Sequence, residues 1–355
     1  MKRIYMSMTD PPPNQLPQLY GVNLQRATKF TYLVSAMNIM ASIGVRARCL
    51  GKLLSTRLYR QFIRPKMEYG MAIAKLNRDD YNILQETQNT CLRKIYGTKT
   101  NHSMAIIHHL ANLEFIVDRV TTLQAKFMPD DALFPTLLPQ ARQTKGLRSW
   151  TSVIRKNKIW QSLDTTTQLD HHMVTNSGLK TAIKQHIKST HIQRCQRKNS
   201  KLLNQCRQQL GIDPILWLPM TSIEHNLCIH YRLGWITNHQ QQPCPNCHQT
   251  THLSKQHLLS CHRVHTFLSI PKNISDPISF ILNRLPKTPP TSYQKRVYWK
   301  IIWPKLSYIL HQLHRTYRPE YYTTPSPPTN QFGHLLLQWI EPPLVPHASP
   351  SNLNL

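Results

Sequence analysis

The sequence is poor in glycine and in acidic side chains, and it contains no long apolar run. Ten glycines stand against 26 prolines among the 355 residues. This balance argues against glycine-rich phosphate loops, and neither a P-loop nor a dinucleotide-binding fingerprint occurs. No apolar run approaches the roughly 20 residues that a membrane-spanning helix needs, and the N-terminus lacks the apolar core of a signal peptide. We therefore expect an intracellular protein, in the nucleus or the cytoplasm, with no membrane partner and no small-molecule substrate.

The scarcity of acidic residues leaves a large excess of positive charge. Lysine and arginine number 44 and aspartate and glutamate 16, so the formal net charge is +28 and the isoelectric point lies near 10.1. Solubility alone does not require so much charge of one sign. A polyanion is the simplest partner, and we expect binding to RNA or DNA through the phosphate backbone.

Four residues near the middle of the C-terminal half have the spacing of a metal site. Cys244 and Cys247 form a Cys-x2-Cys pair, and His257 and Cys261 follow, four residues apart. In a reducing compartment such cysteines are thiols or metal ligands rather than disulfides. The Cys-x2-Cys turn brings two thiolates together, and the helix places an imidazole one turn from a third thiolate. These four groups outline a tetrahedral metal site. Because all four positions are filled, such a site is structural rather than catalytic. We predict that these four residues bind Zn2+.

Chance offers a competing interpretation of this cluster, because the chain holds eight cysteines and 19 histidines. The fourth ligand is also open, since other histidines lie close by, namely His248, His252, His262 and His265. We favour His257 because it alone pairs with Cys261 at a spacing of four residues inside an apolar run.

Apolar residues recur at steps of three and four along most of the chain, which predicts helices. We expect a mainly α fold with several helical units, a small zinc-stapled knuckle and a Pro-rich, disordered C-terminal tail. The expected regions are an extended segment 1–20, a helical region 21–139, a basic helical region 140–215, a zinc-binding unit 216–265, C-terminal helices 266–318 and the tail 319–355.

Prolines set the expected ends of several helices. Two helices are predicted within residues 23–64, with a glycine at the break between them, and Pro65 should stop the second. Pro304 should kink or interrupt the helix expected over residues 297–317. Within the Pro-rich tail, a short helix is expected only at residues 333–340.

The most basic long stretch lies between residues 140 and 215, and no acidic residue occurs from His171 to Ile212. Lys180, Lys184 and Lys188 would share one face of a helix whose apolar stripe docks against the protein, so that each lysine can meet a phosphate. Aromatic residues are few here, which indicates backbone contacts rather than base stacking. The competing interpretation is an ordinary solvated helix face. Further basic residues expected at this interface are Arg194, Arg197, Lys198 and Lys201.

Several short motifs follow one another along the chain: Leu19–Val22, Leu58–Gly70, Leu84–Gln88, Leu92–Gly97 and, before the metal-ligand cluster, Tyr231–Trp235. In this order they resemble non-LTR retrotransposon reverse transcriptases. The first motif is similar to the end of the palm, and the next three are similar to the region just after it. The cluster resembles the zinc-binding segment near the C-terminus of such open reading frames, particularly fungal ones. The resemblance implies that residues 21–139 form a thumb-like helical region that grips a template–primer duplex, and it implies a place in a retroelement ribonucleoprotein.

The catalytic palm of that family has no counterpart in this sequence. A reverse transcriptase needs carboxylates that hold two divalent metal ions, but neither Asp79-Asp80 nor Asp130-Asp131 lies in an aromatic-x-Asp-Asp hairpin between apolar strands. We therefore expect a fragment or remnant that is not an enzyme and that binds nucleic acid. The alternative is a zinc-stabilised scaffold for a protein partner, such as the missing polymerase half.

Overall fold

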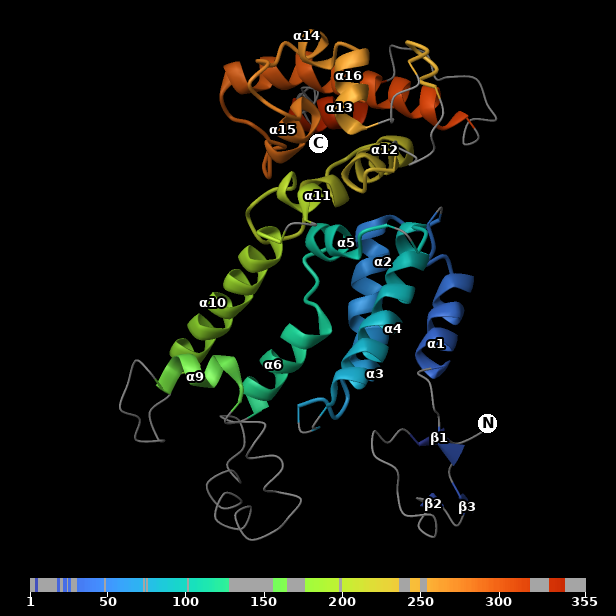
Figure 1. The fold of residues 1–355 in the computed structure, drawn as a ribbon, viewed down its shortest axis with the longest axis vertical. Coiled ribbons are helices and arrows are strands. Elements are labelled where there is room, and N and C mark those ends of the chain that lie inside the picture. Colours follow the sequence, from blue (N-terminus) through green and yellow to red (C-terminus); the bar gives the residue numbers. More distant parts are fainter. Residues whose placement is uncertain are drawn as a thin grey trace, which may run out of the picture. The chain divides into compact units, whose positions relative to one another are not determined.

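Most of the residues that the structure describes are helical, which confirms the prediction of a mainly α fold (Figure 1). The chain divides into two compact units, called here unit 1 (residues 1–200) and unit 2 (residues 201–355). The computed structural model describes residues 4–5, 18–19, 22–23, 25–26, 31–47, 49–72, 74, 76–100, 102–127, 156–164, 176–197, 200–235, 243–249, 254–319 and 332–341.

Unit 1 begins with four strands of two residues each. Strand β1 (Ile4–Tyr5) pairs in parallel with β4 (Gln25–Arg26). Strand β2 (Gln18–Leu19) pairs antiparallel with β3 (Val22–Asn23). Both pairs join residues from the two sides of position 20, where the sequence predicts a boundary between an extended segment and a helical region.

Helix α1 (Thr31–Ser42) is followed by α2 (Lys52–Leu58), by the π-helical turn η1 (Tyr59–Ile63) and by α3 (Arg64–Glu68). The prediction that Pro65 stops the second helix is wrong, because η1 and α3 continue it to Glu68. The N–H of Arg64 donates to the carbonyl of Tyr59, five residues back, so the hydrogen-bond register shifts just before the proline. Pro65 then falls in the first turn of α3, where a missing N–H is tolerated.

Helix α4 (Arg78–Tyr96) is capped at both ends. Asn77 and Asp80 form a capping box, in which each side chain accepts the backbone N–H of the other at 2.9 Å. Gly97 ends the helix at φ 67°, a left-handed conformation that glycine adopts without strain. A Cβ at this position would also lie 2.7 Å from the Cβ of Ala47.

Polar contacts join α4 to η1 and to the segment between the next two helices, α5 (Met104–Leu110) and α6 (Ile116–Phe127), and join α6 to α3. The hydroxyl of Tyr59 donates to Gln88 Oε1 at 3.1 Å, and Gln88 Nε2 donates to the carbonyl of Glu114 at 3.1 Å. Arg119 on α6 donates two hydrogen bonds of 2.8 Å to the carboxylate of Glu68. This bidentate pair holds the end of α3 against α6.

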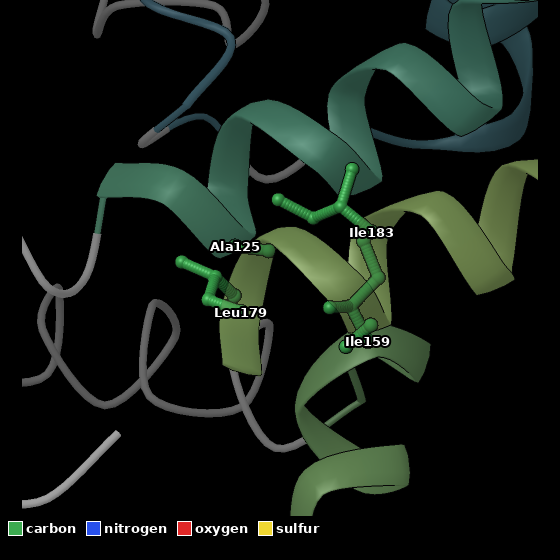
Figure 2. Close-up of a cluster of buried hydrophobic side chains, with 5 residues drawn as sticks. Ala125, Ile159, Leu179 and Ile183 are labelled. Atoms are coloured by element: carbon green, nitrogen blue, oxygen red, sulfur yellow. The ribbon is translucent and has the colours of Figure 1, made fainter. Parts of the chain in front are cut away.

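A small apolar cluster joins α6 to α9 (Lys158–Asp164) and α10 (Asn176–Cys195). Figure 2 shows Leu179 and Ile183 of α10 beside Ala125 of α6 and Ile159 of α9. All four side chains are buried. One face of α10 is therefore fixed to the protein by apolar burial, and the opposite face is left at the surface.

The described part of unit 2 contains α11 (Lys201–Asn204), the 3-10 turn η2 (Pro214–Leu216) and six further helices. Buried side chains of α12 and α16, among them Leu227 and Trp303, form part of its core. The bounds of the further helices are α12 (Ser222–Arg232), α13 (Lys255–Cys261), α14 (Val264–Phe267), α15 (Pro277–Asn283), α16 (Tyr293–Tyr317) and α17 (His334–Ile340).

The buried carboxylate of Glu224 connects three helices of unit 2. It closes a capping box with Thr221, whose N–H donates to it at 2.9 Å. It also accepts the hydroxyl of Ser307 on α16 at 3.0 Å and the backbone N–H of Gly333, before α17, at 2.7 Å. Because these donors satisfy a carboxylate in the interior, the three helices depend on one another.

Two expectations for the C-terminal part can be compared with the structure. Pro304 does not interrupt its helix, because α16 runs from Tyr293 to Tyr317 with the proline inside it. The short helix expected at residues 333–340 is confirmed as α17, and it packs in the core of unit 2, since Leu336 and Ile340 are buried. The rest of the Pro-rich tail, residues 320–331 and 342–355, lies outside the described residues.

The predicted region boundaries also differ from the two units. The division at residue 200 falls within the basic region expected at 140–215. Residues after it pack within unit 2, since Arg207 donates to the carbonyl of Leu285 at 2.7 Å and Arg232 to that of Gln205 at 2.7 Å. The regions expected at 216–265 and 266–318 share one unit. None of the helices in the described ranges combines the length and the apolar character that a membrane span requires.

Candidate metal centre

The first two residues of the cluster lie in a short closed loop. The N–H of Cys244 donates to the carbonyl of Gln249 at 2.9 Å, and the N–H of His248 donates to the carbonyl of Cys244 at 2.7 Å. His248 takes a left-handed backbone conformation, with φ 57°. These contacts fold the loop back on itself, so the thiols of Cys244 and Cys247 face the same point.

Helix α13 supplies the other two residues. Ser254 caps the helix by accepting the N–H of His257 at 3.1 Å. His257 and Cys261 are four residues apart and therefore project from one face of the helix. Leu258 and Leu259, on other faces, are buried and anchor the helix in unit 2.

The ligand atoms of Cys244, Cys247, His257 and Cys261 all lie within 4.8 Å of one another. The sulfur atoms of Cys244 and Cys261 are 3.8 Å apart, and Cys247 Sγ is 3.5 Å from Nε2 of His257. Three sulfur donors and one nitrogen donor at such separations can surround a metal ion. The structure thus brings together the four residues that the sequence predicts as metal ligands.

Two of the competing histidines make other contacts. Nε2 of His262 lies 3.1 Å from the hydroxyl of Tyr317, and Nε2 of His265 lies 2.7 Å from the carbonyl of Ile274. The third, His248, belongs to the loop and is not among the clustered ligand atoms. His252 lies outside the described residues.

Two polar side chains that the sequence analysis did not select contact the cysteine sulfurs. The hydroxyl of Tyr317, at the end of α16, lies 3.2 Å from Cys244 Sγ. Asn246 donates its amide N–H to Cys261 Sγ at 3.1 Å. Asn246 lies inside the Cys-x2-Cys motif and could have been examined as a donor. Tyr317 is far away in sequence and gives no local signal.

The thiols of the cluster titrate differently. Burial acts to raise the pKa of Cys244, but hydrogen bonds from Tyr317 and from backbone N–H groups outweigh it and lower the pKa to about 6. Burial and the neighbouring Cys247 and Cys244 raise the pKa of Cys261. The first proton therefore leaves easily, and a metal cation would favour the loss of the others.

The basic residues predicted to bind phosphate form a row on α10. Lys180, Lys184 and Lys188 are exposed, and their spacing places them along the side of the helix that does not enter the apolar cluster. No acidic residue occurs in α10. We call these three residues the lysine row.

The other basic residues expected at this interface differ from the lysine row in their exposure or in the part of the chain to which they belong. Arg194 is largely covered, forms an ion pair with Asp118 and stacks over the Phe115 ring at 4.3 Å from its centroid, so it secures α10 to the region of α6. Arg197 and Lys201 are exposed, and Lys201 belongs to unit 2. Lys198 lies outside the described residues.

The two acidic pairs considered as catalytic candidates can be placed only in part. Asp79 and Asp80 lie in the first turn of α4, and Asp80 is engaged in the capping box with Asn77. Asp130 and Asp131 lie outside the described residues.

Protein-family models, curated proteins and solved structures were all compared with the chain, and none matches it.

Proposed function

We propose that the chain is a non-enzymatic nucleic-acid-binding protein, which contacts the phosphate backbone of RNA or DNA through the lysine row. The observation that carries the proposal is the asymmetry of α10, whose apolar side is buried against α6 and α9 while its lysines point into solvent without acidic neighbours on the helix. A solvated helix normally mixes charges of both signs. A row of one sign is suited to a polyanion.

The length of the lysine row fits a nucleic-acid backbone. Eight residues of helix rise about 12 Å. Duplex DNA carries one charge per roughly 1.7 Å of its axis, so about seven phosphates lie within that length. Each lysine can therefore meet its own phosphate, and such contacts hold the nucleic acid without reading its sequence.

We further propose that Zn2+ occupies the cysteine and histidine cluster as a structural ion. With zinc–sulfur bonds of about 2.3 Å, two sulfurs of a tetrahedral site are about 3.8 Å apart. The 3.8 Å between Cys244 and Cys261 agrees with that separation. Three thiolates and one imidazole would leave no open position for water or substrate, which is the character of a structural site. Purified protein should contain one zinc per chain, and elemental analysis measures this directly.

The resemblance to non-LTR retrotransposon reverse transcriptases suggests the complex in which the chain binds nucleic acid. The chain would act as part of a retroelement ribonucleoprotein, without a polymerase site of its own. On a primed template with Mg2+ or Mn2+, the purified chain should incorporate no nucleotides. Template-dependent extension that is lost in Asp79→Asn would contradict this proposal.

A protein partner is the second candidate, and exposed apolar side chains of unit 1 favour it. The exposed fractions are 92% for Tyr69, 67% for Ile39, 66% for Ile43 and 50% for Phe62. An apolar interface is almost insensitive to salt, whereas phosphate contacts weaken steeply as salt rises. Binding of labelled duplex RNA and DNA across a salt series therefore separates the two candidates. Steep, sequence-independent salt dependence supports the phosphate contacts, and absence of binding at low salt favours the protein partner.

A further inference from the structure

The hydroxyl of Tyr317 lies between two groups of the candidate metal centre. It is 3.2 Å from Cys244 Sγ and 3.1 Å from Nε2 of His262. His262 directly follows the ligand Cys261 and caps the end of α13. Its ring is thus only two hydrogen bonds away from a metal-ligating sulfur, and imidazole is a common metal ligand. His262 is therefore a competitor of His257 for the fourth position of the metal site.

The hydroxyl of Tyr317 has a single hydrogen to donate, and this fixes the direction of its hydrogen bonds with Cys244 and His262. When Cys244 binds a metal ion its sulfur is a thiolate, which accepts hydrogen bonds but has no proton to donate. The O–H of Tyr317 must then donate to Cys244 Sγ. The remaining contact requires His262 to donate its Nε2–H to the Tyr317 oxygen. Nε2 of His262, the ring nitrogen that Tyr317 contacts, then carries a hydrogen and has no lone pair for a metal ion.

We propose that Tyr317 determines which histidine completes the metal site, by holding His262 in its Nε2–H tautomer and away from the metal, so that His257 is the fourth ligand. Tyr317 is in this sense a positioning residue that acts through His262. The inference rests on the proposed metal site. It extends that site by assigning a role to a residue on α16, far from the Cys-x2-Cys motif in sequence.

The test uses Co2+ bound to the full chain, because its visible absorption reports both the ligand number and the thiolate content of the site. His257→Ala should weaken Co2+ binding at least about tenfold, the scale of effects seen around metal sites. Tyr317→Phe added to His257→Ala should regain much of that affinity and restore the four-ligand spectrum, because His262 becomes able to bind. The triple variant with His262→Ala should lose the regain. Circular dichroism of every variant checks separately that the chain still folds.

A second measurement needs no substitution. Long-range proton–nitrogen NMR spectra of the zinc-loaded protein should show the Nε2–H tautomer for His262 and a metal-bound Nε2 for His257. A hydrogen on Nδ1 of His262, with a bare Nε2, would overturn the proposal. The proposal would also be overturned if the double variant regained no Co2+ affinity, or if the triple variant with His262→Ala kept the regained affinity. A parent chain that binds neither Co2+ nor Zn2+ would overturn the metal site itself, which is a distinct result.

Discussion

His108 is a fully buried histidine in unit 1, and its surroundings suit the neutral ring. Its Nδ1 lies 3.2 Å from the carbonyl of Leu113 and its Nε2 lies 3.3 Å from Nε2 of Gln85. Nδ1–H can donate to the carbonyl. Nε2 also lies 3.3 Å from Asn89 Oδ1; in the neutral ring the bare Nε2 accepts one hydrogen of the Gln85 amide, which donates its other hydrogen to Asn89 Oδ1 at 3.0 Å. The ring also stacks on Phe115, with centroids 4.2 Å apart. Burial lowers the pKa of His108 to about 3, since a charged ring would lose its hydration.

This lowered pKa predicts a loss of stability in mild acid. The unfolded chain binds a proton at His108 near pH 6.5, whereas the folded chain does so only near pH 3. The stabilising contribution is therefore complete above about pH 6.5 and falls by about 1.4 kcal/mol per pH unit below it. Urea unfolding at pH 7 and pH 5 should show that His108→Gln removes about 2 kcal/mol of the difference between the two conditions. An unchanged pH difference in the variant would show that His108 is protonated in the folded protein.

At the residue scale, the four candidate metal ligands could be found from sequence, whereas the side chains that contact them could not. The spacing of His257 and Cys261 reflects one turn of a helix, which is local geometry. The hydroxyl of Tyr317 reaches Cys244 only because α16 ends beside the loop. Contacts of this kind depend on packing between elements that are distant in sequence. No local pattern encodes them.

At the scale of elements, a proline explains the wrong prediction of a helix end at Pro65, and Pro304 does not interrupt its helix. The rule that proline ends a helix assumes an uninterrupted α-helical hydrogen-bond register. Before Pro65, the π turn η1 changes that register. Pro304 lies inside α16, which packs in the core of unit 2 with Trp303 and Leu306 completely buried. Apolar burial of several large side chains can outweigh the roughly 3 kcal/mol that an interior proline costs.

Helix α17 depends on a glycine that no other residue can replace without strain. Gly333 has φ 78°, and a Cβ there would lie 2.4 Å from Cδ1 of Trp303. The clash involves a buried ring rather than a flexible side chain, and the N–H of Gly333 also donates to Glu224. The fold of α17 onto α16 therefore requires glycine at this position.

We expect Gly333→Ala to destabilise unit 2 by about 2–4 kcal/mol. Left-handed backbone strain contributes about 1 kcal/mol, and overpacking against Trp303 contributes about 1–3 kcal/mol. Gly70→Ala is a matched control, because Gly70 also has φ 78° but a Cβ there would meet nothing within 4 Å. Denaturant unfolding gives both values. Equal losses in the two variants would mean that α17 does not pack against Trp303.

At the scale of the whole molecule, the proposed metal site and the lysine row belong to different units. The four clustered ligands lie in unit 2 and the lysine row lies in unit 1. The sequence indicates both features, but it places the region boundaries differently. Charge and spacing identify a helix face or a ligand set, whereas a domain boundary depends on which helices share a core.

Removal of the proposed zinc ion should act on unit 2 alone. Structural zinc contributes on the order of 10 kcal/mol in small finger peptides, more than a short segment gains from its own core. A strong chelator, or Cys247→Ser, should therefore increase amide hydrogen exchange in α13 and in the adjoining end of α16, and leave α4 and α6 unchanged. If the purified protein contained no zinc, and amide exchange in α13 and α16 were the same before and after chelation, unit 2 would not be stabilised by a metal ion.

The salt dependence of nucleic-acid binding tests the proposed function most directly. Each lysine that neutralises a phosphate adds about 0.7–0.9 to the slope of log affinity against log salt. Replacing Lys180, Lys184 and Lys188 with glutamine should lower the slope by about two units, weaken binding similarly for every sequence, and leave the metal content unchanged. The control variant Lys272→Gln/Lys287→Gln/Lys295→Gln removes the same charge from exposed positions of unit 2, outside both α10 and the thumb-like region, and its slope should change by less than about one unit. Wild-type affinity and slope in the lysine-row variant, for both RNA and DNA duplexes, would contradict phosphate binding by this face and favour the protein partner.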